Sequence, residues 1–389
     1  MTRTDTIIAI LCYITVASIV LYYNMTHPLV NDGVQEYQEY LLNIQNGWQY
    51  RISLTNSCLV TTWIPALLSR GLGLDEYILF RVFPVFFYPL MATFVYLIAR
   101  RYLEVKYAVV AVAVVIVNSH ILYFPDIGRV GVAIAFMAGM LWALLERRLI
   151  WTIVFGALVV FSHYGTALIA TGIVGFAFFG LLLWKRIFEK YCFVVFSLLV
   201  LLVVVWLFIV AGFSGEIMSK TLFQTKGGVW EDTGQVENPD FLDATIREPA
   251  VQDALGIDLA SMPTPKKLEI VANWIVVLLV SLGLLLFVRN KAVDSPAKLV
   301  AIGLYGLILF TIALPWLSVF YGGMRVYFTS LSILATCFPL GACWLAKKVR
   351  VSPFALIIPV LLFYALGTSG LIYLPFGLVK YFTVVYSLG

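Results

Sequence analysis

The sequence predicts an all-α polytopic membrane protein with about 11 transmembrane helices. Of the 389 residues, 62% are hydrophobic and only 12% are charged, and the mean hydropathy is +0.96. Soluble domains are roughly half apolar, so this composition excludes that class. Apolar runs near the ~20 residues that a helix needs to cross a bilayer recur along the chain, whereas a membrane barrel would show only alternating apolar residues. We therefore expect a helical fold, with residues 1–389 forming a single transmembrane domain.

The apolar runs define eleven predicted spans. They lie near residues 6–24, 77–99, 107–123, 130–146, 149–162, 164–184, 191–213, 268–288, 298–317, 326–346 and 353–373. A twelfth apolar piece, residues 56–69, is short, contains Thr61, Thr62 and Pro65, and is followed by Arg70. We interpret this piece as a helix that lies along the membrane surface.

The distribution of basic residues predicts the orientation of the chain. With the amino terminus in the cytoplasm, the inner segments contain Arg3, Arg100, Arg101, Lys106, Arg147, Arg148, Lys185, Arg186, Lys190, Arg289, Lys291, Lys298, Lys347, Lys348 and Arg350. Only five acids accompany them: Asp5, Glu104, Glu146, Glu189 and Asp294. Every short inner loop is then basic, as the positive-inside rule expects. The net charge of +5 mostly reflects these loops, and no extended basic stripe suggests a nucleic-acid partner.

Three carboxylates stand in the first external loop, residues 25–76, within the stretch VNDGVQEYQEY. If this stretch is helical, Asp32, Glu36 and Glu39 share one face and lie within ~6 Å of one another. Like charges that close beside apolar surface raise at least one pKa and give a carboxylate able to accept a proton near neutral pH. The alternative is an ordinary solvated acidic loop.

Two arginines are predicted at the outer ends of spans four and ten. Arg129 in FPDIGRVG and Arg325 in SVFYGGMRVY each follow a glycine where a span begins, so free N–H groups and the positive helix dipole face the outer boundary. Both arginines could bind a phosphate by charge-assisted hydrogen bonds. The alternative is that each arginine extends to lipid headgroups or pairs with a local acid such as Asp126.

His163 in FSHYGT and Tyr321 in SVFYGG are further polar candidates at the same outer level. A histidine at the mouth of a helical hairpin is more often an interfacial hydrogen-bonding residue than a catalyst. All three histidines map to the outer side, but spacing alone does not predict that they converge on a metal. No cofactor is indicated, and a divalent metal has no clear motif.

The longest external loop, residues 214–267, is acid-rich and has helix-start signals at Asn238 and Pro239. A loop of this length is usually functional or disordered. We expect either a partly ordered cover over the outer face or simple disorder in its QTKGGVWEDTGQVEN part.

External carboxylates and arginines suit a group transfer whose donor arrives through the lipid, because nucleotide-activated donors are cytoplasmic. The long first external loop with acids after span one, the surface helix before span two and the basic inner loops resemble the GT-C superfamily of polyprenyl-phosphate-sugar-dependent glycosyltransferases. The segments NDGVQEYQEY, LTNSCLVTTWIPALLSRGLGLDEYILFRVFPVFFYPLMATFVYLIARR, FSHYGT and LPWLSVFYGGMR are similar to an uncharacterised prokaryotic membrane-protein family that shares this architecture. The likeness covers the first half of the chain and the region of Arg325.

The resemblance implies that Asp32 is the counterpart of the superfamily's first-loop catalytic acid, with Glu36 as its rival. It implies donor-phosphate roles for Arg129 or Arg325, and a prokaryotic plasma-membrane location with an extracytoplasmic active face. Many members have two acids separated by one residue, whereas Asp32 and Glu36 are separated by three, which puts a metal in doubt. The WWD signature of oligosaccharyltransferases is absent.

The expected activity is transfer of a sugar from a polyprenyl phosphate donor to a hydroxyl acceptor of unknown identity. Asp32 and Glu36 are the catalytic candidates, and Arg129, Arg325, His163, Tyr321, Glu39 and Asp126 are the substrate-binding candidates. A transporter or flippase of lipid-linked saccharides is the first alternative, but such carriers usually place ionisable groups or broken helices at mid-membrane depth, and the predicted spans show essentially none. A non-catalytic envelope scaffold is the second.

Overall fold

A computed structural model describes residues 2–26, 29, 32–48, 57–118, 128–206, 251–252, 255–257, 259–314, 322–369 and 371. These residues form helices, turns and loops, with no strand among them, so the all-α prediction is confirmed for this part of the chain. The first half contains α1 (Arg3–Thr26), α2 (Asp32–Asn46), α3 (Trp63–Leu72), α4 (Glu76–Val82), η1 (Phe83–Phe86), α5 (Tyr88–Tyr102), α6 (Val105–Ile116), α7 (Gly128–Leu145), α8 (Leu149–Ser162), α9 (Tyr164–Trp184) and α10 (Lys190–Val203). The second half contains α13 (Thr264–Arg289), α14 (Ser295–Ala313), α16 (Gly323–Leu334), α17 (Cys337–Lys348) and α18 (Pro353–Thr368).

Helices lie in the described parts of all eleven predicted spans. Among the described residues, six helices are long and apolar enough to cross a membrane: α1, the continuous run of α4, η1 and α5, and α7, α9, α13 and α14. The bent pair of α16 and α17 makes a seventh if it is counted as one span, and α6, α8, α10 and α18 are shorter apolar helices. This architecture is compatible with a polytopic membrane protein.

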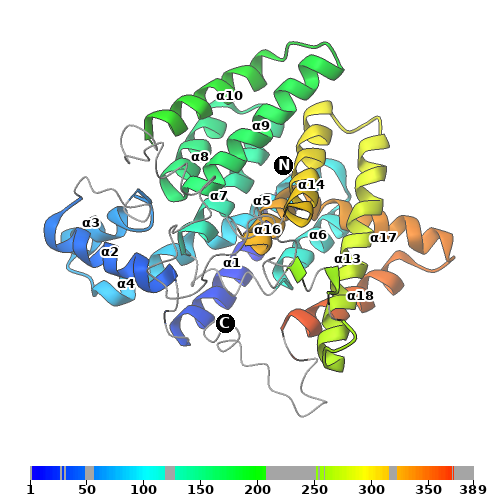
Figure 1. The fold of residues 1–389 in the computed structure, drawn as a ribbon, viewed down its shortest axis with the longest axis horizontal. Helices are drawn as coiled ribbons and strands as arrows, with labels where there is room; N and C mark the ends of the chain where they lie inside the picture. The colour runs from blue at the N-terminus through cyan, green and yellow to red at the C-terminus, as the bar shows by residue number, and fades with distance from the viewer. Residues whose placement is uncertain are drawn as a thin grey trace.

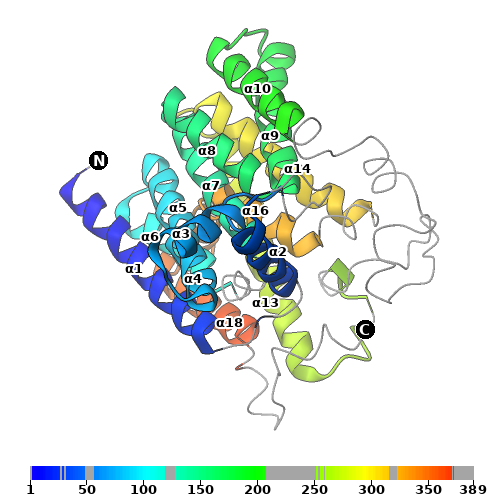
Figure 2. The same cartoon turned by 90° about the vertical axis from the view of Figure 1, so that its left-hand side faces the viewer.

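Helix α7 lies at the centre of the molecule and α1 at its edge. In the most apolar 18-residue stretch of α7, 94% of the residues are buried, whereas in that of α1 only 22% are. The α7 sequence GRVGVAIAFMAGMLWALL is rich in glycine and alanine, which allow helix axes to approach closely. Helices α5, α8, α9 and α16 all pack against it. Figure 2 shows α1 on the outside of the bundle, where it packs along α5.

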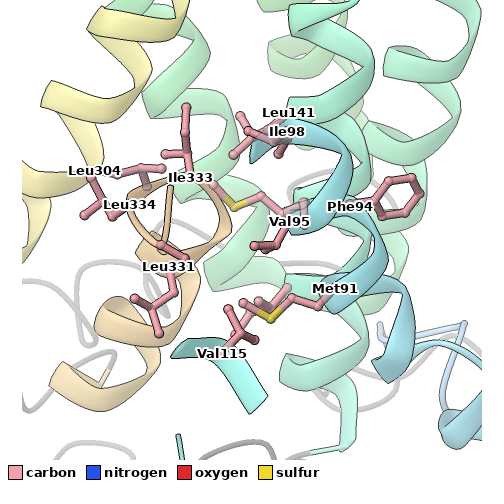
Figure 3. Close-up of a cluster of buried hydrophobic side chains, with 14 of the residues drawn as sticks. Met91, Phe94, Val95, Ile98, Val115, Leu141, Leu304, Leu331, Ile333 and Leu334 are labelled. Atoms are coloured by element: carbon pink, nitrogen blue, oxygen red, sulfur yellow. The ribbon is translucent and has the colours of Figure 1, made fainter. Parts of the chain in front are cut away.

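The core between these helices is made of interdigitated aliphatic side chains. Figure 3 shows Met91, Val95 and Ile98 of α5 facing Leu331, Ile333 and Leu334 of α16, with Leu141 of α7 and Leu304 of α14 alongside. Each of these eight side chains is at most 1% exposed. Residues from spans far apart in the sequence therefore form one packed interior, which fixes the position of α16 relative to α7.

Helices α2, α3 and α4 form a separate lobe at one end of the molecule (Figure 1). Tyr40, Ala66 and Phe80 make its small buried core, and Tyr37 packs on the rings of Tyr40 and Phe80. Within the predicted surface helix at residues 56–69, residues 57–62 form a turn and the helix begins at Trp63. The Thr61 and Thr62 hydroxyl groups donate to the Cys58 carbonyl oxygen, which stabilises the turn in place of another helical turn.

The predicted tenth span is broken rather than continuous. Helix α16 ends at Leu334, α17 begins at Cys337, and the segments 325–334 and 337–348 meet at an angle of 67°. Pro339 has no N–H to donate to the carbonyl of residue 335, which favours a helix break just before it. The span predicted near residues 326–346 is therefore made of two helices that meet at a bend.

Helix α17 is held very closely by α13. A Cβ atom added to Gly283 would lie 1.7 Å from the Cys337 carbonyl oxygen, and one added to Gly341 would lie 1.9 Å from the Leu279 carbonyl oxygen. Only glycine permits this backbone contact. The broken span therefore consists of a segment fixed to α13 and a second segment, α16, packed on α14 and α7.

Candidate functional site

The centre of the candidate site is the contact between α2 and the amino-terminal end of α7. The backbone N–H of Arg129, the second residue of α7, donates to both carboxylate oxygens of Glu36, at 3.2 Å to Oε1 and 3.1 Å to Oε2. The Arg129 Nε atom lies 3.5 Å from Oε1, and the two side chains are only 9% and 1% exposed. Glu36 therefore supplies the anion that the free N–H groups and positive dipole at this helix end favour.

Gly128 makes this close approach feasible. A Cβ atom at this position would lie 2.7 Å from Glu36 Oε2 and 3.5 Å from the Tyr88 hydroxyl oxygen. The Tyr88 hydroxyl donates to the Gly128 carbonyl oxygen at 3.3 Å and so links α5 to the same helix end. A glycine precedes each of the two arginines in the sequence, and the role of Gly128 is to admit the carboxylate from α2.

His163 caps the amino-terminal end of α9 and is 2% exposed. Its Nδ1 atom accepts a hydrogen bond from the Thr166 backbone N–H at 3.1 Å and lies 3.0 Å from the Thr166 hydroxyl oxygen. Because Nδ1 is an acceptor, the neutral ring carries its proton on Nε2 and can donate from there. Burial lowers the pKa of His163 well below its usual value, and the positive charges of Arg129 and Arg325 lower it further.

The two arginines predicted to bind a phosphate therefore approach one histidine. Arg129 begins α7 and Arg325 is the third residue of α16, nearly 200 positions later in the chain, yet the charges of both act on the His163 ring. Arg325 is half-buried. The fold thus brings together four of the predicted site residues: Glu36, Arg129, His163 and Arg325.

Cys58 belongs to the same cluster and was not predicted. It is 1% exposed, burial raises the pKa of its thiol to about 12, and it lies close enough to Arg129 and Glu36 for both charges to act on it. The thiol is therefore neutral and unsuited to act as a nucleophile. Its turn is joined to the end of α8 by the bond from the Val60 N–H to the Phe161 carbonyl oxygen, at 3.2 Å. A lone cysteine in an apolar stretch carries no signal that could have identified this position.

The other predicted residues are placed less completely. Asp32 is the first residue of α2, one helical turn before Glu36, but its side chain lies outside the described part of the structure. Glu39 is half-buried on α2. Asp126 and Tyr321 lie outside the described residues, as do residues 214–250 of the predicted external loop. Within the described residues, no group of three or more His, Cys, Asp or Glu side chains could hold a metal ion.

A second polar cluster lies at the other end of α7, about 25 Å away along the helix. Arg101 bridges Glu146 and Asp294 at 2.8 Å each, and Arg147 pairs with Glu189 at 2.9 Å. A cavity of about 160 Å³ lies among these residues. Every one of these charges has an opposite partner, so the cluster ties α5, α7, α10 and α14 together.

Comparison with known proteins leaves the family open, because no protein-family model and no curated protein sequence matches this chain.

Proposed function

We propose that this protein is an extracytoplasmic membrane glycosyltransferase that moves a sugar from a polyprenyl phosphate donor to a hydroxyl acceptor in envelope glycan or glycolipid synthesis. The proposal includes the GT-C-like architecture, eleven membrane crossings and a cytoplasmic amino terminus in the prokaryotic plasma membrane. It combines the sequence resemblance with the geometry at the outer ends of α7, α9 and α16.

One observation carries the proposal: the carboxylate of Glu36, from the first loop, pairs with Arg129 at the start of α7. The charges of Arg129 and Arg325, which lower the pKa of His163, support it. Arginine charges beside a neutral N–H donor form a suitable binding site for a phosphate. Glu36 fixes Arg129 through both the backbone N–H and the guanidinium group, so this arginine is preorganised. We therefore assign Glu36 a positioning role.

Asp32 is the proposed base. It takes the proton of the acceptor hydroxyl, whose oxygen attacks the anomeric carbon of the donor sugar. The bond between that carbon and the phosphate oxygen breaks with inversion, and its electron pair leaves on polyprenyl phosphate. Arg129 and Arg325 stabilise the charge on that leaving group, and the His163 Nε2–H donates to the phosphate or the sugar. Tyr321, Glu39 and Asp126 complete the proposed substrate-binding set.

The test is sugar transfer by the purified full chain from defined polyprenyl phosphate donors. Asp32→Asn should abolish transfer, and Glu36→Gln should reduce it while leaving a folded protein. Arg129→Gln and Arg325→Gln should weaken donor binding. Full activity in both carboxylate variants would remove the proposed base and its partner. A wild-type protein that neither transfers sugar nor moves lipid would favour the scaffold alternative.

The broken span gives one specific observation in favour of transport. Ser332 and Thr336 flank the break, are fully buried, and have hydroxyl groups without a hydrogen-bond partner in the described structure. Discontinuous helices with polar groups at mid-membrane depth are typical of carrier binding sites. Movement of a labelled lipid-linked sugar across vesicles, without transfer to an acceptor and with sensitivity to Thr336→Val, would support this second candidate function.

A further inference from the structure

Three helices are each followed, two residues after their last residue, by an arginine with a left-handed backbone. Among the described residues, positive φ angles outside glycine occur only at Arg147 (55°), Arg186 (54°) and Arg350 (60°). The next residue in each case returns its N–H to a carbonyl oxygen of the preceding helix: Arg148 to Ala143, Ile187 to Leu181 and Val351 to Ala346. Such helix ends usually carry glycine, because a side chain is strained there.

The arginines therefore need a reason other than backbone geometry. The chain uses glycine at other left-handed positions, such as Gly47 and Gly73. All three arginines follow the carboxyl ends of α7, α9 and α17, the ends that the positive-inside pattern assigns to one face. A cation at a helix carboxyl end gains from the dipole, but a lysine or arginine one residue earlier would gain it without strain.

All three turns expose apolar side chains, as Leu149 and Ile150 do after Arg147. In residues 183–188, the exposed fractions are 76% for Leu183, 66% for Trp184 and 52% for both Ile187 and Phe188. In residues 344–351, Trp344, Val349 and Val351 are exposed in the same way. Each tryptophan ring has a lysine ammonium beside it, Lys185 at 5.2 Å and Lys348 at 5.6 Å from the ring centroid. Exposed tryptophan next to a cation is typical of the boundary between lipid headgroups and acyl chains.

In the described part of the chain, the cations of the turns at residues 183–188 and 344–351 have no protein counter-charge. The five acids of this face pair elsewhere: Asp5 with Arg100, Glu104 with Lys106, Glu146 and Asp294 with Arg101, and Glu189 with Arg147. Lys185, Arg186, Lys348 and Arg350 have no acidic partner among the residues that the structure describes. Arg147, the third left-handed arginine, differs because Glu189 neutralises it.

We propose that the turns at residues 183–188 and 344–351 each bind the headgroup phosphate of an anionic phospholipid. The left-handed arginine and the lysine just before it in the turn, Lys185 or Lys348, hold the phosphate, and the tryptophan and neighbouring apolar side chains lie at the acyl boundary. The left-handed Arg186 stands one residue, and the left-handed Arg350 two residues, after the lysine that lies beside a tryptophan ring. This inference rests on the membrane location of the helices and is independent of the proposed transferase activity.

The test compares phosphatidylglycerol with phosphatidylcholine of the same acyl chains, bound to the purified full chain in detergent and counted by native mass spectrometry. Wild type should prefer phosphatidylglycerol. Arg186→Gly and Arg350→Gly suit the left-handed backbone, so they should remain folded, with no loss of melting temperature in phosphatidylcholine. Each should weaken phosphatidylglycerol binding about fivefold, the effect of removing one cation near a lipid surface. Arg186→Lys should retain most of the affinity.

Arg147→Gly is the matched control, because it has the same backbone geometry but a guanidinium group already paired with Glu189. It should leave phosphatidylglycerol binding unchanged. The proposal is overturned if wild type binds both lipids equally, if neither Arg186→Gly nor Arg350→Gly weakens binding, or if Arg147→Gly weakens it as much. It is also overturned if millimolar inorganic phosphate removes the preference, since the site would then be for the free ion.

Discussion

Glu36 lies on α2, and both of its carboxylate oxygens accept a hydrogen bond from the backbone N–H of Arg129, 93 residues later in the chain. The same carboxylate is within 3.5 Å of the Arg129 guanidinium group. One buried carboxylate therefore pairs with a buried cation and accepts the free Arg129 N–H in the first turn of α7. Helix α7 is the most deeply buried of the candidate spans. Loss of this carboxylate should affect both stability and the candidate site.

Glu36→Ala should lower the free energy of unfolding by about 3 kcal/mol, because it leaves the Arg129 charge buried without its partner. Glu36→Gln should lower it by only about 1.5 kcal/mol, since the amide oxygen still accepts from the Arg129 N–H. Denaturant unfolding of the purified protein in mixed micelles measures both values. Gln38→Ala, an exposed change in the same helix, is the control and should stay within about 0.5 kcal/mol of wild type. Equal stability of Glu36→Ala and Gln38→Ala would contradict the role given to the ion pair.

Gly128→Ala should displace the Glu36 carboxylate, because the new methyl group would be 2.7 Å from Oε2. We expect a loss of about 2 kcal/mol in unfolding free energy, as for overpacking elsewhere, together with weaker binding of the donor phosphate. Gly172→Ala in α9 is matched to it, since a Cβ atom there meets nothing within 4 Å. That control should be neutral or slightly stabilising, because alanine favours a helix more than glycine does. Thermal melting compares the two variants, and Gly128→Ala should have the lower melting temperature.

His163 should make the protein less stable in mild acid. Its pKa is near 6.5 when unfolded and well below that in the buried native site, where Arg129 and Arg325 oppose a third positive charge. Protons therefore bind the unfolded chain more readily, so stability is full above about pH 6.5 and falls as the pH decreases toward the native pKa. Each unit in that window removes about 1.4 kcal/mol.

Unfolding measured between pH 7.5 and 5.5 tests this dependence. His163→Asn retains a side chain that can cap α9 but has no titrating group, so its stability should change less over the same range. An identical pH dependence in wild type and His163→Asn would show that other groups control the acid response.

Much of the candidate site could be predicted from local sequence. The acids at positions 32, 36 and 39 do lie in one helix, and the arginines at positions 129 and 325 do stand in the first turns of their helices. Their pairing could not be predicted, because it depends on where α2 docks against α7, and helical spacing carries no information on contacts between distant segments. The expectation that the acids would chiefly perturb one another omitted Arg129, whose Nε atom lies 3.5 Å from the Glu36 carboxylate.

The break between α16 and α17 could have been predicted in part from the sequence. Pro339 stands inside the predicted span at residues 326–346, and proline inside a helix often marks its interruption. Proline alone is not decisive, since Pro359 lies inside α18 without ending that helix. The backbone contact of α17 with α13 is the additional cause, and such tertiary packing cannot be read from hydropathy.

Gly341→Ala should separate α17 from α13 and destabilise the protein by about 3 kcal/mol, the upper end of overpacking effects. The added methyl group would lie 1.9 Å from the Leu279 carbonyl oxygen, a backbone atom that cannot move aside as a flexible side chain could. Gly306→Ala in α14, where a Cβ atom meets nothing within 4 Å, controls for the substitution itself. Denaturant unfolding in micelles should separate the two variants clearly. If Gly341→Ala were as stable as Gly306→Ala, α17 would not be held against α13 at this distance, and the account of the break as partly imposed by α13 would fail.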